Sequence, residues 1–218
     1  RDELTADDLS NQLRKSVVFL GNPFMDKVFT ENSNSNDYRL AILPGSRRPE
    51  LDNNLLLLLK TISFLPDQMS SIGKLSIDIA LVSSMDNESL EKVAIKAGWK
   101  FIASDSCCQL IKDSLVVNLF RNRFVEILQG CNVVMSMAGT AAEQAVGLAK
   151  PVIQLPGHGP QFTPGFAEAQ RRLLGPTVFC SEVNSNSNQI FFKTAELVKE
   201  ILVRIQKDLL FQKECINQ

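Results

Sequence analysis

The chain has 218 residues, of which 44% are hydrophobic and 22% are charged, and its formal net charge is -1. This length suits one large α/β domain, or one domain with part of another. A net charge close to zero creates no overall positive field, so nucleic acid is excluded as a bulk partner.

The cysteines and the apolar segments point to the cytoplasm. The five cysteines are odd in number and none has CxxC spacing, so we expect neither a disulfide framework nor a zinc site. No apolar run reaches the roughly 18 to 20 residues of a membrane span, and no signal-peptide pattern opens the chain. We therefore expect a cytoplasmic protein without a metal or a cofactor.

Residues 1–37 have the pattern of the last elements of one domain followed by a linker to the next. Thr5 followed by Asp8 resembles a capping box and begins a helical spacing of leucines. Residues 17–20 then predict a short buried strand that ends at Gly21. We expect 1–20 to be the tail of an N-terminal domain and 21–37, which contain a polar Asn/Ser tract, to be an inter-domain linker.

From Tyr38 onward, strand and helix patterns alternate, which predicts an α/β fold with a doubly wound parallel sheet over residues 38–180 and a closing helical region over 181–218. We expect strands at 39–43, 75–82, 99–103, 115–120, 132–136, 152–155 and 177–179, with a short strand or a turn between 103 and 115. We expect helices at 51–65, 87–97, 124–129, 139–148, 166–174 and 190–210. Ligands of such sheets bind at the carboxyl ends of the strands.

The segment MAGTAAEQ, residues 137–144, is the first candidate site. Gly139 and Thr140 lie at an expected strand-to-helix turn, where backbone N–H groups and the helix dipole attract an anion. Glu143, one turn into the helix, is suited to accept hydrogen bonds from two sugar hydroxyls. The turn is a candidate for a nucleotide phosphate and ribose, although many such turns carry Gly-Thr only for tight packing.

Three pairs of arginines fall in or near the same edge of the expected sheet: Arg47 with Arg48, Arg121 with Arg123, and Arg171 with Arg172. Cations gathered at that edge would bind a diphosphate, whereas the alternative is that two pairs are charges on solvated helix faces. We favour Arg47, because it follows Gly45 and Ser46 at a strand end and precedes a helix. Gly45 allows close backbone approach and Ser46 offers a hydroxyl.

The loop 155–165, LPGHGPQFTPG, is longer than the roughly 2 to 6 residues of a plain α/β connection. It is a candidate binding loop in which Gln161 would hold sugar hydroxyls, and the alternative is a surface excursion. His158, the single histidine, is more often structural or solvated than a general base. The motifs GxGxxG, GxxxxGK[ST] and GxSxG are absent, which disfavours a Rossmann dehydrogenase, a P-loop NTPase and a serine hydrolase.

Three segments together resemble lipid A disaccharide synthase. Leu43–Arg47 resembles its LPGSR motif and Ala138–Ala141 resembles its SGTAT turn. Gly21–Asp26, GNPFMD, is similar to its GHP-hydrophobic-x-D segment, with Asn22 in place of histidine. The resemblance is closest to a bacterial group of lipid-A-disaccharide synthase-related proteins and extends from residue 1 to about residue 175.

The resemblance implies a GT-B glycosyltransferase fold, in which two Rossmann-like domains bind the donor nucleotide mainly through the C-terminal one, here this chain. It implies that Gly45, Ser46 and Arg47 face the donor phosphates and that Gly139 and Thr140 contact the diphosphate. The other implied contacts are Phe120, Arg121 and Phe124 on the base side, Glu143 or Gln144 at the ribose, and Gly159, Gln161 and Phe162 at the donor sugar. Alignment on Gly-Thr-Ala puts Gln144, not Glu143, at the synthase's glutamate.

The implied function is binding of a UDP-sugar donor for transfer to a lipid-linked or glycolipid acceptor. The general base would belong to the N-terminal domain, so this chain alone would bind the donor without catalysis. Such an enzyme would be peripheral on the inner membrane. Two alternatives are half of a UDP-GlcNAc 2-epimerase-like enzyme, against which a single histidine argues, and a non-catalytic nucleotide-sugar-binding module.

Overall fold

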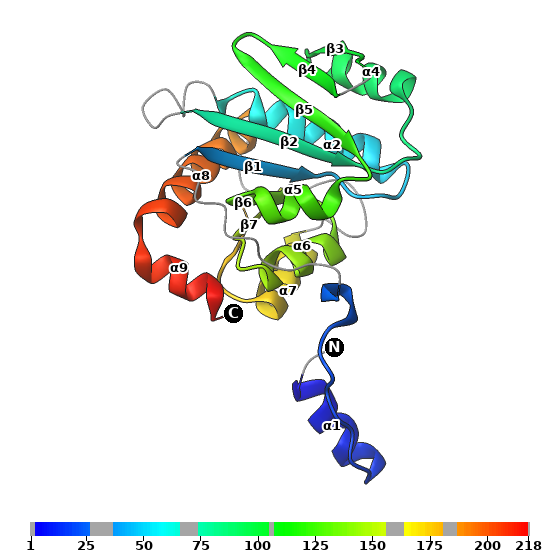
Figure 1. Ribbon diagram of the computed structural model, residues 1–218, viewed down its shortest axis with the longest axis vertical. Coiled ribbons are helices and arrows are strands. Elements are labelled where there is room, and N and C mark those ends of the chain that lie inside the picture. The colour runs from blue at the N-terminus through cyan, green and yellow to red at the C-terminus, as the bar shows by residue number, and fades with distance from the viewer. Residues whose placement is uncertain are drawn as a thin grey trace.

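The computed structural model describes residues 3–26, 37–65, 74–104, 107–155, 164–180 and 187–217. Within these residues one sheet of eight strands has the order β3-β4-β5-β2-β1-β6-β7-β8 (Figure 1). The strands are β1 (Tyr38–Leu43), β2 (Leu75–Leu81), β3 (Lys100–Ile102), β4 (Cys108–Lys112), β5 (Leu115–Arg121), β6 (Val133–Ser136), β7 (Val152–Gln154) and β8 (Val178–Cys180). The predicted α/β fold is confirmed.

The sheet is parallel from β5 to β8, but β4 runs antiparallel to both of its neighbours. A wholly parallel sheet was therefore the wrong expectation for the β3-β4-β5 edge. The physical reason is the length of the connections: Asp113 and Ser114 alone join β4 to β5, whereas a parallel neighbour needs a crossover of about a dozen residues or more. Asp113 adopts a positive φ of 51° in that tight turn.

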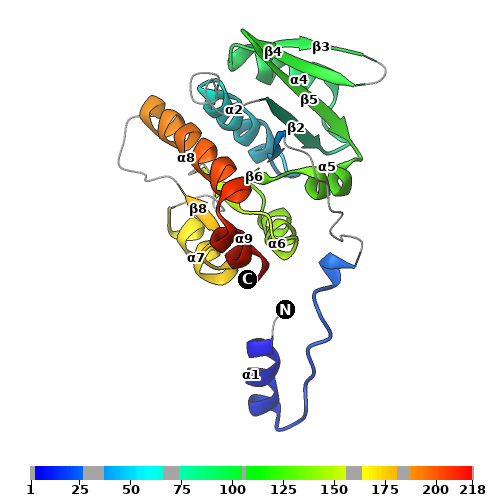
Figure 2. The same cartoon turned by 60° about the vertical axis from the view of Figure 1, so that its left-hand side comes forward.

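Helices cover both faces of the sheet (Figures 1 and 2). The helices of the described residues are α1 (Glu3–Leu13), which lies apart from the sheet, the 3-10 turn η1 (Pro23–Met25), α2 (Glu50–Ile62), α4 (Asn87–Lys96), α5 (Phe124–Gly130), α6 (Gly139–Gly147), α7 (Pro164–Leu174), α8 (Ser187–Lys207) and α9 (Leu209–Ile216). The single helix expected over 190–210 is two helices, because the Asp208 carboxylate accepts from the backbone N–H groups of Leu210 and Phe211 and so begins α9.

Strand β1 shows why two layers of helices are needed. Its side chains alternate, and Leu40 and Ile42 join a core with α2, α4 and α8, while Ala41 and Leu43 join a second core with α5 and α6. All four residues are at most 3% exposed. A strand that is apolar on both faces belongs at the centre of a doubly wound sheet.

The chain changes direction at β1. From β1 it proceeds through β2 toward β5, and it then returns through α5 to β6 on the opposite side of β1. This is a topological switch point, where the connections leaving two adjacent strands diverge and open a crevice above their carboxyl ends.

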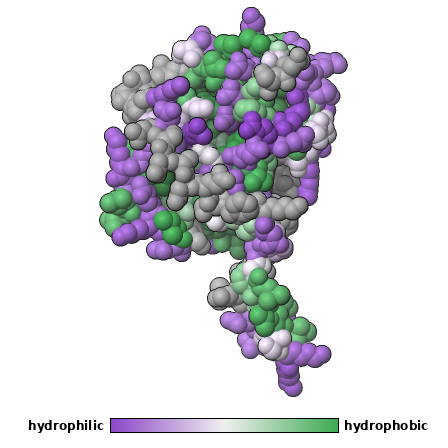
Figure 3. Space-filling view, viewed as in Figure 1, coloured by the Kyte–Doolittle hydropathy of each residue, from purple (hydrophilic) through white to green (hydrophobic). Residues whose placement is uncertain are grey.

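An N-terminal arm, which we define as residues 3–22, extends away from this body (Figures 1 and 2). Part of its surface is green, that is apolar, in Figure 3, beside purple, hydrophilic parts. Residues 17–20 form no strand, and Val18 and Leu20 are 71% and 93% exposed, so the expected buried strand is wrong. The backbone N–H of Val17 donates instead to Ser10 Oγ at 2.9 Å, which ties this segment to α1.

The arm meets the body at α6. Asn22 Nδ2 donates to Glu143 Oε1 at 3.1 Å, and Met25 of η1 packs on Gly147 so closely that an ideal Cβ there would lie 2.7 Å from Met25 Cε. Within the described ranges, no helix is both long and apolar enough to cross a membrane.

Candidate functional site

A cavity of about 470 Å³ opens at the switch point, above the carboxyl ends of β1, β2 and β6. Its size is that of a small-molecule site. It is lined by Leu43, Pro44, Gly45, Ser46, Arg47, Glu50, Asn54, Ala80, Leu81, Val82, Phe124, Met137, Ala138, Gly139, Thr140, Ala141 and Gln144. The two segments that the sequence singled out, 45–47 and 139–140, therefore lie on one cavity.

The turn after β1 touches the turn after β6. Gly45 has a φ of 101°, a conformation that L side chains rarely adopt, and an ideal Cβ on it would lie 3.4 Å from Met137 O. The backbone conformation calls for glycine at this position, and a Cβ on it would be in close van der Waals contact with the turn after β6. The N–H of Met137 donates to Leu43 O at 2.9 Å, so the sheet hydrogen bonding continues up to the edge of the cavity.

The first turn of α6 presents its backbone to the cavity. Ala138 is the N-cap in an extended conformation, and among the described residues no side chain caps this helix. Ser136 Oγ accepts from the N–H of Ala138 at 3.2 Å, which fixes the chain just before the helix. Helix α2 likewise begins without a side-chain cap from the described part of the chain, after Pro49. In the first turn of α2, however, the N–H of Leu51 already donates to Arg47 O at 2.7 Å. The uncapped N–H donors that favour an anion at this cavity are therefore mainly those of α6.

Arg47 adds a cation to the cavity wall. Its side chain is exposed, and no carboxylate of the described residues lies within ion-pair distance of it. Its neighbour Arg48 instead pairs with Asp52, Nε to Oδ1, at 3.5 Å. Glu50 also lines the cavity, and it is the acidic counterpart of Arg47 among the lining residues. The wall therefore offers both a cation and a carboxylate acceptor.

Gln144 and Glu143 point to different surroundings. Gln144 lines the cavity, whereas Glu143 is not among the lining residues and accepts a hydrogen bond from Asn22 of the arm. Adjacent helical positions are about 100° apart around the axis, so both side chains cannot face the same ligand.

The residues expected on the base side are divided. Phe124 lines the cavity, but Phe120 and Arg121 do not. Arg121 donates twice to Met85 O, at 3.0 and 2.9 Å, and once to Asn87 Oδ1 at 2.8 Å. The Arg123 guanidinium lies 4.9 Å from the centroid of the Phe120 ring. Both arginines of this pair therefore interact with other residues of the protein: Arg121 with Met85 and Asn87, and Arg123 with Phe120.

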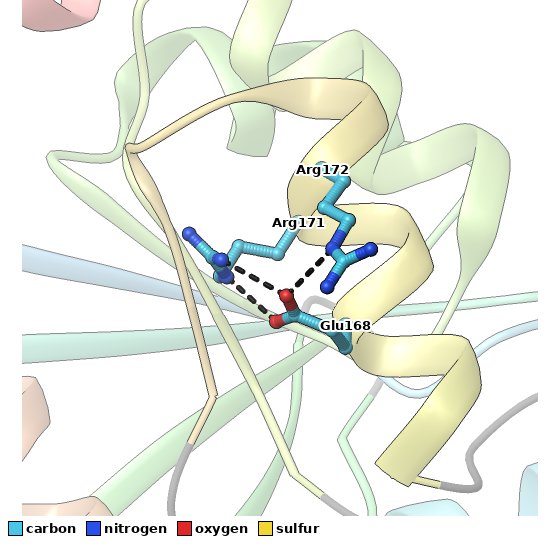
Figure 4. Close-up of polar contacts among 3 residues, drawn as sticks. All are labelled: Glu168, Arg171 and Arg172. Carbon is cyan, nitrogen blue, oxygen red and sulfur yellow. Dashed lines mark hydrogen bonds and ion pairs between the residues drawn. The ribbon is translucent and has the colours of Figure 1, made fainter.

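The third arginine pair is bound to a carboxylate of its own helix (Figure 4). Arg171 Nε and one of its terminal nitrogens donate to the two oxygens of Glu168 at 2.8 and 3.0 Å, and Arg172 Nε donates at 2.9 Å. These hydrogen bonds lower the pKa of Glu168 from 4.5 to about 2. Neither arginine lines the cavity.

Gly159, Gln161 and Phe162, the residues expected at the donor sugar, lie outside the described residues, as does His158. Two polar lining residues were not anticipated as site residues from the sequence. They are Glu50, in the first turn of α2, and Asn54, which is 2% exposed in the middle of an apolar helix. A polar residue in the run LDNNLLLLL was the signal available for Asn54. No group of three or more potential metal ligands occurs among residues that the structure describes.

No protein-family model and no curated protein matches the sequence. Solved structures give distant likenesses. The spinosyn rhamnosyltransferase SpnG complexed with spinosyn aglycone superposes with a TM-score of 0.49 at 13% identity, over 92% of this chain and 44% of that one. SpnG complexed with thymidine diphosphate gives 0.48 at 14% identity over the same shares, and TarM gives 0.37 at 12% identity over 100% of this chain and 42% of that one.

The chain spans less than half the length of each of these structures. All three matches are distant both in sequence and in superposition, and the functional proposal rests on the geometry of the cavity instead.

Proposed function

We propose that this chain is the donor-nucleotide-binding part of a GT-B-type glycosyltransferase. Its donor is a UDP-sugar and its acceptor a lipid-linked or glycolipid molecule, as in lipid A disaccharide synthase. The observation that carries the proposal is the cavity at the topological switch point, where two helix N-termini and Arg47 meet.

In this proposal the diphosphate lies between the turn of Gly45, Ser46 and Arg47 and the turn of Gly139 and Thr140. Uncapped backbone N–H groups and one guanidinium would stabilise the negative charge that develops on the departing diphosphate. Since the donors are already fixed by the fold, little reorganisation is needed when the sugar leaves.

The remaining lining residues suit the rest of a nucleotide sugar. Gln144 is positioned for the ribose hydroxyls and Phe124 offers an apolar surface to the base. Glu50 would repel a bare polyphosphate, but it accepts hydrogen bonds from hydroxyls. A wall with both Arg47 and Glu50 therefore favours a ligand that carries anionic groups and hydroxyls together.

Other parts of the reaction lie beyond this chain in the proposal. The general base and the acceptor site belong to a partner N-terminal domain, so the chain alone binds the donor and catalyses no transfer. The segment containing Gly159, Gln161 and Phe162 would reach the donor sugar. With a lipid-linked acceptor, the protein would act in the cytoplasm and associate peripherally with the inner membrane.

The test is calorimetric titration of UDP and UDP-GlcNAc into the chain and into two single variants. Arg47→Ala removes the cation from the cavity wall, and a charge-assisted hydrogen bond of about 1.5–3 kcal/mol corresponds to a loss of roughly 10- to 150-fold in affinity. Arg48→Ala is the matched control. The guanidinium of Arg48 pairs with Asp52, and Arg48 does not line the cavity. Equal effects of the two variants, or no UDP binding by the native chain at millimolar concentration, would refute the proposal.

A further inference from the structure

Asn54 is a polar residue placed where an apolar one would pack without cost. It lies in the second turn of α2 and is 2% exposed, and its neighbours along the helix are leucines of the core. Its Oδ1 atom is buried and accepts no hydrogen bond from any residue that the structure describes. A leucine would avoid burying that unpaired oxygen, so core packing does not explain the asparagine.

The amide nitrogen of Asn54 supplies the explanation. Asn54 Nδ2 donates to Pro44 O at 3.0 Å and lies 3.4 Å from Met137 O, to which it also donates. Pro44 immediately precedes Gly45, and Met137 lies two residues before Gly139. One NH₂ group therefore joins the turn after β1 to the turn after β6.

The two hydrogen bonds of Asn54 Nδ2 pair two carbonyl groups at the end of the sheet that cannot pair with each other. The last backbone bond between the two segments runs from the N–H of Met137 to Leu43 O at 2.9 Å. Beyond it both turns offer a carbonyl, Pro44 O and Met137 O, and two acceptors cannot pair with each other. An NH₂ group has two donors, so a single amide satisfies both carbonyls and holds them at a fixed separation.

The close approach at Gly45 is independent of these hydrogen bonds and points to the same junction. An ideal Cβ on Gly45 would lie 3.4 Å from Met137 O and 3.8 Å from Asn54 Nδ2. Gly45 therefore lies against the other turn at contact distance, and the asparagine joins the two turns by hydrogen bonds. Both residues also line the cavity.

From these observations we infer that Asn54 is a positioning residue that sets the distance between the two phosphate-facing turns. This inference rests on the proposed function for its ligand. The distance matters because donors bind a diphosphate strongly only when they are already placed around it. The NH₂ group of Asn54 acts on the ligand through the two turns that it joins.

Two substitutions of Asn54 and one control test the inference. Asn54→Asp keeps the shape and replaces the NH₂ group by an acceptor that repels both carbonyls, and Asn54→Leu keeps the branching at Cγ, in a larger side chain, without a donor. The control is Thr61→Val on the same helix, because Thr61 is also fully buried and donates only to Leu57 O, at 3.0 Å. All three variants remove hydrogen bonds of a buried side chain, two in the Asn54 variants and one in Thr61→Val, but only the Asn54 variants separate the turns.

Two readouts are measured: UDP affinity by calorimetry, and hydrogen exchange of the Met137 amide by NMR. We expect UDP to bind about tenfold more weakly to both Asn54 variants and the Met137 amide to exchange at least about tenfold faster, with Thr61→Val close to the native chain in both. Asn54→Leu provides the result if Asn54→Asp does not fold. Asn54 variants that match Thr61→Val in exchange overturn the inference. Faster exchange in a chain whose native form binds no UDP supports the positioning role and refutes the proposed ligand.

Discussion

Replacing Gly45 by alanine tests the contact between the two turns, and Gly21 provides a control with the same backbone. The two glycines have φ values of 101° and 100°. An ideal Cβ on Gly45 would lie 3.4 Å from Met137 O, whereas one on Gly21 meets nothing within 4 Å. A comparison of the two alanine variants therefore separates the cost of the contact from the cost of the backbone conformation.

The expected magnitudes follow from these geometries. A side chain at this φ costs roughly 1–3 kcal/mol, and the lower entropy of an unfolded alanine chain returns about 0.4–1 kcal/mol. At Gly45 the methyl group would also lie in van der Waals contact with the Met137 carbonyl, so the turn cannot relax the backbone strain without moving its neighbour and keeps most of that cost. Gly45→Ala should therefore lose about 2 kcal/mol, which corresponds to about 4–8 °C in Tm for a chain of this size.

The corresponding substitution in the arm, Gly21→Ala, should destabilise the protein less than Gly45→Ala. Gly21 lies at the base of the arm, where the backbone can rotate without displacing a neighbour, so we expect Gly21→Ala to lower Tm by less than about 3 °C. Thermal unfolding followed by circular dichroism measures both shifts, and calorimetry measures UDP affinity. Gly45→Ala should weaken UDP binding about tenfold, since the strained turn can relax only by moving its neighbour, and Gly21→Ala should leave it unchanged. Equal shifts in Tm with unchanged affinity in both variants would show that the turns do not touch.

Two further outcomes are expected. Gln144→Ala should weaken UDP binding about 2- to 10-fold, the value of one neutral hydrogen bond, while Glu143→Ala stays within twofold; the opposite order in calorimetry would assign the ribose to Glu143. In an NMR titration the Glu168 carboxyl should have a pKa of about 2, and Arg171→Ala with Arg172→Ala should return it toward 4.5. Because the folded pKa is the lower one, the ion pairs stabilise the fold above about pH 4.5 and their contribution disappears as the pH falls through about 2; a native value near 4.5 would contradict the cluster.

The parallel part of the sheet could be predicted because its strands are mostly apolar and are separated by helical patterns. The same property placed the turns of Gly45 and Gly139 at one edge, and the cavity contains both. The antiparallel edge was harder, since β4 is short and its segment is polar at both ends. Its direction depends on a two-residue turn at Asp113, which periodicity does not reveal.

The exposed segment 17–20 shows a second limit. Four apolar residues in a row have the composition of a buried strand, but a strand also requires a neighbour for its backbone, and in the described residues the sheet ends elsewhere. Side-chain direction was likewise out of reach: Gln144 and Glu143 differ by one position, and only the placement of α6 decides which one faces the cavity. Asn54 depends on two carbonyls that are 93 residues apart in sequence, so its partners could not be inferred from its neighbours.

Helix α6 serves two parts of the molecule at once. Its first turn and Gln144 form the cavity wall, while Glu143 and Gly147 receive Asn22 and Met25 from the base of the arm. A helix of nine residues is a rod about 13 Å long that tilts as a unit and does not bend. A movement of the arm together with η1 would therefore either break the contacts of Asn22 and Met25 with α6 or tilt the Gly139 end of the helix. Helix α6 thus couples the position of the N-terminal segment to the shape of the cavity.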